Sequence, residues 1–116
     1  MKIIILNVVA VVLMLGGNAR AAEMPALAKK LECIACHDID KRVVGPSWME
    51  VSRKYRKASK YAYGGTEYTL EDGLVMKVSK GGSGSWGAMP MPANDANGSK
   101  QAEIRELVRF VLGLAR

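Results

Sequence analysis

The stretch Cys33-Ile34-Ala35-Cys36-His37 contains both cysteines and the single histidine of this 116-residue chain. Thiolate sulfur and imidazole nitrogen are side-chain groups that bind soft and borderline metal ions readily. A chain that places all of these groups in one short stretch commits them to one local site, since no other cysteine or histidine exists. The chemistry of this stretch therefore decides what the rest of the chain folds around.

Residues 1–21 have the pattern of a secretory signal peptide. Lys2 gives a basic start, the run from Ile3 to Leu15 is apolar apart from one asparagine, and Ala19-Arg20-Ala21 has small residues at the spacing of a cleavage site. The run is shorter than the ~20 apolar residues that span a bilayer, which disfavours the alternative of a retained membrane anchor. We therefore expect export to the periplasm with cleavage, one domain at residues 22–116, and no stable membrane insertion afterwards.

Three kinds of site use a closely spaced cysteine pair in an exported protein. A structural zinc site needs four nitrogen or sulfur ligands, and the motif supplies three. A thiol–disulfide enzyme places C-x-x-C at the start of a helix that follows a strand, whereas here a helical stretch, residues 25–32, precedes the motif. The third kind is C-x-x-C-H as a c-type haem attachment site, and it uses both thiols and the imidazole at once.

The spacing of the motif suits covalent attachment of haem. Cys33 and Cys36 can each add across one of the two haem vinyl groups, which holds His37 beneath the iron as an axial ligand. No thiol is then left to form a disulfide. The sequence thus predicts one haem c, bound through the two cysteines, with His37 as an iron ligand.

A methionine is the expected second ligand for the iron, because the chain has no other histidine. Met89 and Met91 lie in Trp86-Gly-Ala-Met-Pro-Met-Pro92, hereafter the methionine strap. Pro90 and Pro92 restrict the backbone on both sides of Met91 to an extended form, and such a rigid segment suits holding a thioether against the iron. Spacing alone does not choose between the two methionines.

Four motifs occur together in the chain: Cys33-Ile-Ala-Cys-His37, Val43-Val-Gly-Pro46, Lys77-Val-Ser-Lys-Gly-Gly82, and Trp86-Gly-x-x-Pro90-Met91-Pro92 with Asn94 close behind. In these motifs the chain resembles the small bacterial class I cytochromes c of the cytochrome c-551/c-552 type. The resemblance covers most of residues 22–116.

The resemblance implies a role for each matching position. Met91, between the two prolines, is the second axial ligand, and Met89 packs in the haem pocket. The Pro46 carbonyl accepts a hydrogen bond from the His37 imidazole and fixes its tautomer.

The resemblance also implies three polar contacts near the cofactor. Lys77 and Trp86 donate hydrogen bonds to a haem propionate, as an ammonium and an indole N–H. Asn94 hydrogen-bonds near the methionine sulfur and tunes the potential of the iron. The plain structural alternatives are a surface lysine, a core aromatic and a loop asparagine.

Helical patterns cover much of the remaining domain. Helices are expected at residues 49–55 and 70–79, and Ser99 is expected to cap a final helix. The apolar face of that helix consists of Ile104, Leu107, Val108, Val111 and Leu112. Since no stretch alternates convincingly as a strand, we expect an all-α fold, the cytochrome c fold, with a few helices around one haem and the first and last helices crossing.

Two segments stand outside these patterns. Residues 56–71 form a longer link than the family usually has, and we expect a surface loop or a lid near the haem edge. The stretch Arg53–Lys60 carries five positive charges, which suits either docking of an acidic redox partner or a solvated helix end.

Iron with both axial positions filled, by His37 and Met91, has no open position for a substrate. We therefore expect an electron carrier rather than an enzyme, working as a monomer between periplasmic redox proteins, with no nucleic-acid partner. Two alternatives stay open. One is a five-coordinate haem that binds gases or acts like a peroxidase, and the other is an electron-transfer subunit of a larger oxidoreductase.

Overall fold

The computed structural model describes residues 22–115, so the predicted signal peptide lies outside the described residues. Four α-helices, one 3₁₀ turn and one β-hairpin occur in this part, and no helix there is long and apolar enough to cross a membrane. The elements are α1 (Ala26–Lys30), η1 (Cys33–Ala35), α2 (Trp48–Tyr55), β1 (Lys60–Tyr63), β2 (Thr66–Thr69), α3 (Leu70–Lys80) and α4 (Gln101–Gly113). The helix-rich fold and the approximate positions of the predicted helices are confirmed.

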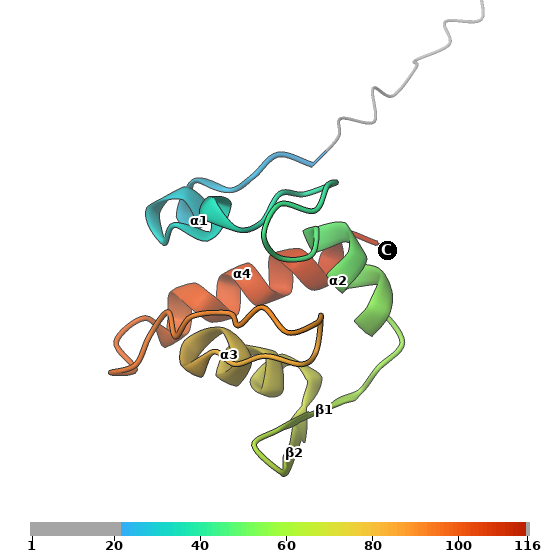
Figure 1. Cartoon of the computed structure of the whole chain (residues 1–116), viewed down its shortest axis with the longest axis vertical. Coiled ribbons are helices and arrows are strands. Elements are labelled where there is room, and N and C mark those ends of the chain that lie inside the picture. Colours follow the sequence, from blue (N-terminus) through green and yellow to red (C-terminus); the bar gives the residue numbers. More distant parts are fainter. Residues whose placement is uncertain (1–21, 116) are drawn as a thin grey trace, which may run out of the picture.

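Helix α4 is the central element of the fold, and it packs against α1, α2 and α3. Its buried side chains belong to two apolar clusters. Leu107 and Val111 belong to a cluster with Ala28, Ile39 and Trp48, against which Cys33 of the motif packs. Ile104 and Val108 pack with α3 and the hairpin. Figure 1 shows α4 crossing the molecule, with α1 on one side of it and α3 on the other. The predicted apolar face of this helix therefore has two neighbours rather than one.

The start of α4 differs from the prediction. The helix begins at Gln101, and Ser99 does not cap it, because the Ser99 hydroxyl donates to Asn97 Oδ1 at 2.8 Å. Buried Asp95 serves the helix start instead, since its Oδ2 accepts from the Lys100 backbone N–H and the Gln101 side chain, both at 3.0 Å. Burial alone would raise the pKa of Asp95, but these hydrogen bonds outweigh it and lower the pKa.

The β-hairpin corrects the expectation that residues 56–71 contain no strand. Strands β1 and β2 pair antiparallel, with Tyr61 opposite Tyr68 and Tyr63 opposite Thr66. Gly64 and Gly65 connect the strands, and both have positive φ angles, which is typical of a two-residue hairpin turn. The signal in the sequence was the run of tyrosines and threonines on both sides of Gly-Gly.

A hairpin of two strands is not stable by itself, and this one packs on α3. The Tyr61 side chain is buried against the helix at Gly73, where an added Cβ would lie 2.6 Å from the Tyr61 Cβ. Thr69 ends β2 and its hydroxyl also caps α3 by accepting from the Asp72 N–H. The hairpin is therefore continuous with α3 and fixed to its surface.

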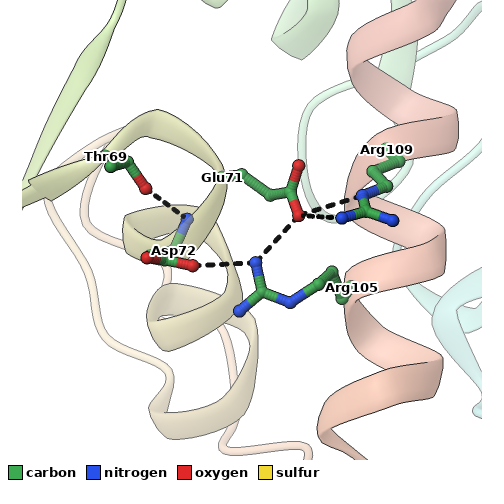
Figure 2. Close-up of polar contacts among 5 residues, drawn as sticks. All are labelled: Thr69, Glu71, Asp72, Arg105 and Arg109. Atoms are coloured by element: carbon green, nitrogen blue, oxygen red, sulfur yellow. Dashed lines mark hydrogen bonds and ion pairs between the residues drawn. The ribbon is translucent and has the colours of Figure 1, made fainter.

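A network of ion pairs joins the start of α3 to α4, as Figure 2 shows. Glu71 Oε1 accepts from Arg105 at 2.8 Å and from Arg109 at 2.9 Å, and Arg105 also pairs with Asp72 at 2.8 Å. The hydrogen bonds from Arg109 and Arg105 lower the pKa of Glu71. Because two arginines share one carboxylate, the network fixes the helix pair more specifically than a single surface ion pair would.

We expect Glu71→Gln to destabilise the fold at neutral pH by about 1 kcal/mol, the upper range for exposed pairs. The folded-state pKa of Glu71 lies below its ordinary value of 4.5, so its contribution is present above that pH and is lost as the pH falls through the lowered pKa. Urea unfolding of the holoprotein at pH 7 and at pH 3, at low salt, measures this difference. Glu106→Gln, an exposed position on α4, is the matched control. An equal destabilisation at both pH values would contradict the assignment.

Candidate haem site

A mostly apolar cavity lies between the motif, three helices and the methionine strap. Seven of the eight site residues predicted from the sequence line it, namely Cys33, Cys36, His37, Pro46, Lys77, Trp86 and Met91. The exception is Asn94, which is not part of the cavity wall. Segments far apart in the chain therefore meet at one site, and helix α4 forms part of the wall between them through Leu107, Val108 and Val111.

The motif forms one tight turn at the wall of the cavity. Helix α1 ends before Glu32, which has a left-handed φ of 60°, and η1 follows directly. The backbone N–H groups of Cys36 and His37 both donate to the Cys33 carbonyl, at 3.2 and 3.0 Å. The two cysteines form no disulfide with each other, and both are half-buried. The turn thus gathers two thiols and an imidazole on one side of an apolar cavity.

The His37 ring is oriented by the backbone that follows the motif. Its Nδ1 lies 2.8 Å from the Pro46 carbonyl oxygen, and a carbonyl can only accept, so Nδ1 carries the proton and donates. This tautomer leaves the Nε2 lone pair available to a metal ion. The contact predicted for Pro46 is therefore present in the structure.

The residue before Pro46 is a glycine because the imidazole packs on its Cα. A Cβ at Gly45 would lie 2.7 Å from His37 Cε1, closer than side chains tolerate. The Gly45 N–H also donates to the Cys36 carbonyl at 2.9 Å, which closes the loop back onto the motif. The sequence analysis included Gly45 in the motif Val43–Pro46 but assigned it no role. Its position directly before the proline was the signal that could have indicated one.

The start of α2 fixes the loop that carries Pro46. Ser47 and Glu50 form a capping box, in which each side chain accepts from the other residue's backbone N–H. The N–H groups of Trp48 and Met49 donate to the carbonyls of Asp38 and Ile39, both at 2.9 Å. These contacts fix the residues directly after Pro46 and so hold its carbonyl in place.

The strap is paired with the glycine segment that precedes it, Gly81–Ser85. Gly82 and Met91 exchange two backbone hydrogen bonds, with N···O distances of 3.0 and 2.9 Å. Gly81 has a φ of 75°, and a Cβ there would overlap the Met91 carbonyl oxygen. The glycine segment therefore has defined backbone partners, and the Met91 backbone packs directly against it.

The remaining predicted residues occupy different positions around the strap. Lys77 and Trp86 line the cavity, and burial lowers the pKa of Lys77. Met89 also lines the cavity, although 66% of its surface is exposed. The Asn94 side-chain nitrogen donates to the carbonyls of Val78 and Pro92, both at 3.2 Å, so Asn94 connects the end of the strap to α3.

A tyrosine pair forms a part of the wall that sequence reasoning missed. Tyr55 and Tyr61 both line the cavity, with ring centroids 5.6 Å apart and an edge-to-face arrangement. Burial, followed by the neighbouring Tyr61, raises the pKa of Tyr55 to about 12. Tyr61 reaches the cavity only because residues 60–69 form a hairpin, so its position depended on the strands that were not expected.

The cavity contains few side chains that could bind a metal ion. Within residues 22–115, no group of three or more histidine, cysteine, aspartate or glutamate side chains lies close enough to hold a metal ion by itself. The cavity instead combines two cysteine side chains, an imidazole whose Nδ1 is hydrogen-bonded, and a thioether in an apolar surrounding. This donor set fits a haem attached through two cysteines.

No protein-family model matches the chain, but similar proteins are known. Cytochrome c-551 of Allochromatium vinosum is 39% identical over 88 residues, which cover 76% of this chain and 82% of the relative. Cytochrome c2 of Rhodocyclus tenuis is 39% identical over 98 residues, covering 80% of this chain and 94% of the relative. The crystal structure of cytochrome c552 from Nitrosomonas europaea superimposes with a TM-score of 0.62 at 36% identity, covering 76% of this chain and 95% of that one.

The chain belongs to the small class I cytochromes c. Its cofactor is therefore one haem c, bound covalently through Cys33 and Cys36. Because proteins of this family are electron carriers, electron transport is the general function of this cytochrome. The expected cytochrome c fold is confirmed by the structural match, and the structure contains a two-stranded hairpin beside its helices.

In this cytochrome we expect Gly45→Ala to disturb the histidine side of the site. The added methyl group cannot coexist with the His37 ring, so the ring or the loop must move, at a cost of about 1–3 kcal/mol typical of overpacking. Urea unfolding and the ferric visible spectrum of the holoprotein measure the effect. The control is Gly113→Ala, where a Cβ meets no atom within 4 Å. Indistinguishable behaviour of the two variants would show that the close contact is unimportant.

Proposed function

We propose that this cytochrome is a periplasmic carrier of single electrons whose iron is bound by His37 and Met91. The observation that supports this ligand pair most directly is that both residues line one cavity from segments far apart in the chain. Each is also fixed by hydrogen bonds: the His37 ring donates to the Pro46 carbonyl, and the Met91 backbone pairs with the Gly82 backbone.

Haem iron supplies a one-electron couple, and the protein residues set its properties. The Pro46 carbonyl keeps the His37 proton on Nδ1 and raises the basicity of Nε2. The soft Met91 thioether favours the ferrous state and therefore a higher potential. With both residues bound, no position remains for a substrate, and fixed ligands change little between oxidation states.

Two polar residues on the cavity wall suit the propionate groups of the cofactor. Lys77 and Trp86 supply an ammonium and an indole N–H on the cavity wall, and we propose that both bind a haem propionate. Burial of Lys77 lowers its pKa, and a propionate beside it would oppose that shift. We propose that Asn94 acts on the ligand by fixing the end of the strap, since its amide nitrogen is bonded to backbone carbonyls.

The basic stretch at residues 53–60 suits docking of an acidic redox partner. All five of its basic side chains are exposed, and Lys54 lies beside the cavity, with its ammonium 4.5 Å from the Trp86 ring centroid. Positive charge next to the cofactor steers encounter with a negatively charged protein and gives a weak, salt-dependent complex. We propose a monomeric carrier that meets its donor and acceptor through this side.

We expect Met91→Ala to remove the ferric iron–sulfur charge-transfer band and to lower the reduction potential. Met89→Ala should retain both properties, because Met89 is placed as an exposed rim residue of the cavity. The measurement is the visible spectrum of oxidised and dithionite-reduced holoprotein, together with a potentiometric titration. A high-spin ferric spectrum in the parent protein would overturn the carrier proposal and indicate an open haem face. Loss of the band in Met89→Ala alone would assign the ligand to Met89.

A further inference from the structure

The β-hairpin directs two tyrosines toward the methionine side of the site. Tyr61 and Tyr63 lie two residues apart on β1 and therefore share one face of the hairpin. The Tyr63 hydroxyl donates to the Gly81 carbonyl at 2.8 Å, and the Tyr61 hydroxyl lies 3.4 Å from the Ser85 hydroxyl. The hairpin thus contacts both ends of the glycine segment that pairs with the strap.

A single peptide group connects Tyr63 to Met91. The carbonyl of Gly81 and the N–H of Gly82 belong to the same planar peptide unit. Its oxygen accepts from Tyr63, and its N–H donates to the Met91 carbonyl at 3.0 Å. Hydrogen bonds at the two ends of one peptide unit polarise each other, so the phenol strengthens the bond that carries the Met91 backbone.

The other end of the glycine segment is fixed as well. The Lys54 ammonium donates to the Ser85 carbonyl at 3.1 Å, while Tyr61 approaches the side chain of the same serine. Helix α2 and the hairpin therefore contact the segment just before the strap begins at Trp86.

The hairpin that makes these contacts is itself held in place by α3. Tyr61 is only 9% exposed and packs against Gly73 of α3, and β2 runs into α3 without a gap. Helix α3 is in turn joined to α4 by Glu71, Arg105 and Arg109 (Figure 2). The Tyr63 hydroxyl is therefore positioned by elements that do not themselves belong to the strap.

We propose that Tyr63 is a positioning residue for the sixth iron ligand, acting through the Gly81–Gly82 peptide to keep the Met91 backbone in place. This inference rests on the proposed ligation by Met91. In this arrangement the hairpin lowers the population of states in which the strap has moved away from the iron. Exogenous ligands then compete less well for the sixth position.

The test compares Tyr63→Phe with Tyr68→Phe in the holoprotein. Tyr68 lies on the same hairpin, and among residues 22–115 its hydroxyl makes no hydrogen bond to the glycine segment or the strap. Two quantities are measured, the affinity of ferric protein for imidazole and the hydrogen-exchange rates of the Gly82 and Met91 amides. The exchange rate of the Val108 amide in α4 serves as the reference for global opening.

For Tyr63→Phe we expect imidazole to bind about fivefold more tightly and the Gly82 and Met91 amides to exchange about fivefold faster. This factor corresponds to one hydrogen bond of about 1 kcal/mol. The Val108 amide and the Tyr68→Phe variant should match the parent. Unchanged exchange at Gly82 and Met91 in Tyr63→Phe overturns the proposal, as does equal acceleration at Val108, since that result indicates a general loss of stability.

The outcomes separate this inference from the proposed ligation. If the parent spectrum shows that Met91 is not an iron ligand, the proposed function fails. Local acceleration of exchange would then show only that Tyr63 fixes the strap, and the ligand-positioning role would be rejected. If the parent shows histidine–methionine ligation and Tyr63→Phe has the imidazole affinity of the parent, the ligation stands and only the role of Tyr63 is rejected.

Discussion

The two-sided burial of α4 is the constraint on which the rest of the structure depends. Leu107 and Val111 pack with the cluster of Ala28, Ile39 and Trp48, which supports the motif, whereas Ile104 and Val108 pack with α3 and the hairpin, which support the strap. Leu107, Val108 and Val111 of this helix line the cavity in which the histidine and methionine sides of the site meet. A shift of α4 would therefore alter the separation of the two proposed axial ligands, His37 and Met91.

Each proposed axial ligand is placed by backbone groups next to a glycine. On one side the His37 ring packs on Gly45 and donates to the following carbonyl. On the other side the Met91 backbone packs on Gly81 and pairs with Gly82. Close approach of this kind leaves no room for a Cβ, so these positions are restricted by geometry rather than by polarity or charge.

The parts of the site that were predictable are those that depend on local covalent chemistry. The spacing of Cys33, Cys36 and His37 is set by the cofactor, and the two prolines around Met91 act on their own segment. The apolar period of α4 likewise predicted its four buried residues, and the fifth residue of the predicted face, Leu112, is partly buried. In all three cases the residues that carry the information are close together in the sequence.

The errors came from contacts between distant residues. The hairpin has few apolar side chains, and Tyr61 and Tyr63 find their partners on Gly73, Gly81 and Ser85, which local pattern cannot indicate. The cap of the last helix was assigned to Ser99 because serine is a common cap, but the buried Asp95 accepts from the Lys100 backbone N–H and from the Gln101 side chain instead. At the helix start, tertiary structure overrode a local preference for a serine cap. In the hairpin, the local signal around Gly64-Gly65 agreed with the structure but was missed.

The tyrosine pair on the cavity wall has a consequence for the polarity of the site. Burial and the neighbouring Tyr61 raise the pKa of Tyr55 to about 12, so the Tyr55 phenol is neutral at physiological pH. The two rings meet edge to face with their centroids 5.6 Å apart, and both line the cavity. This part of the wall therefore presents aromatic surface to the cofactor.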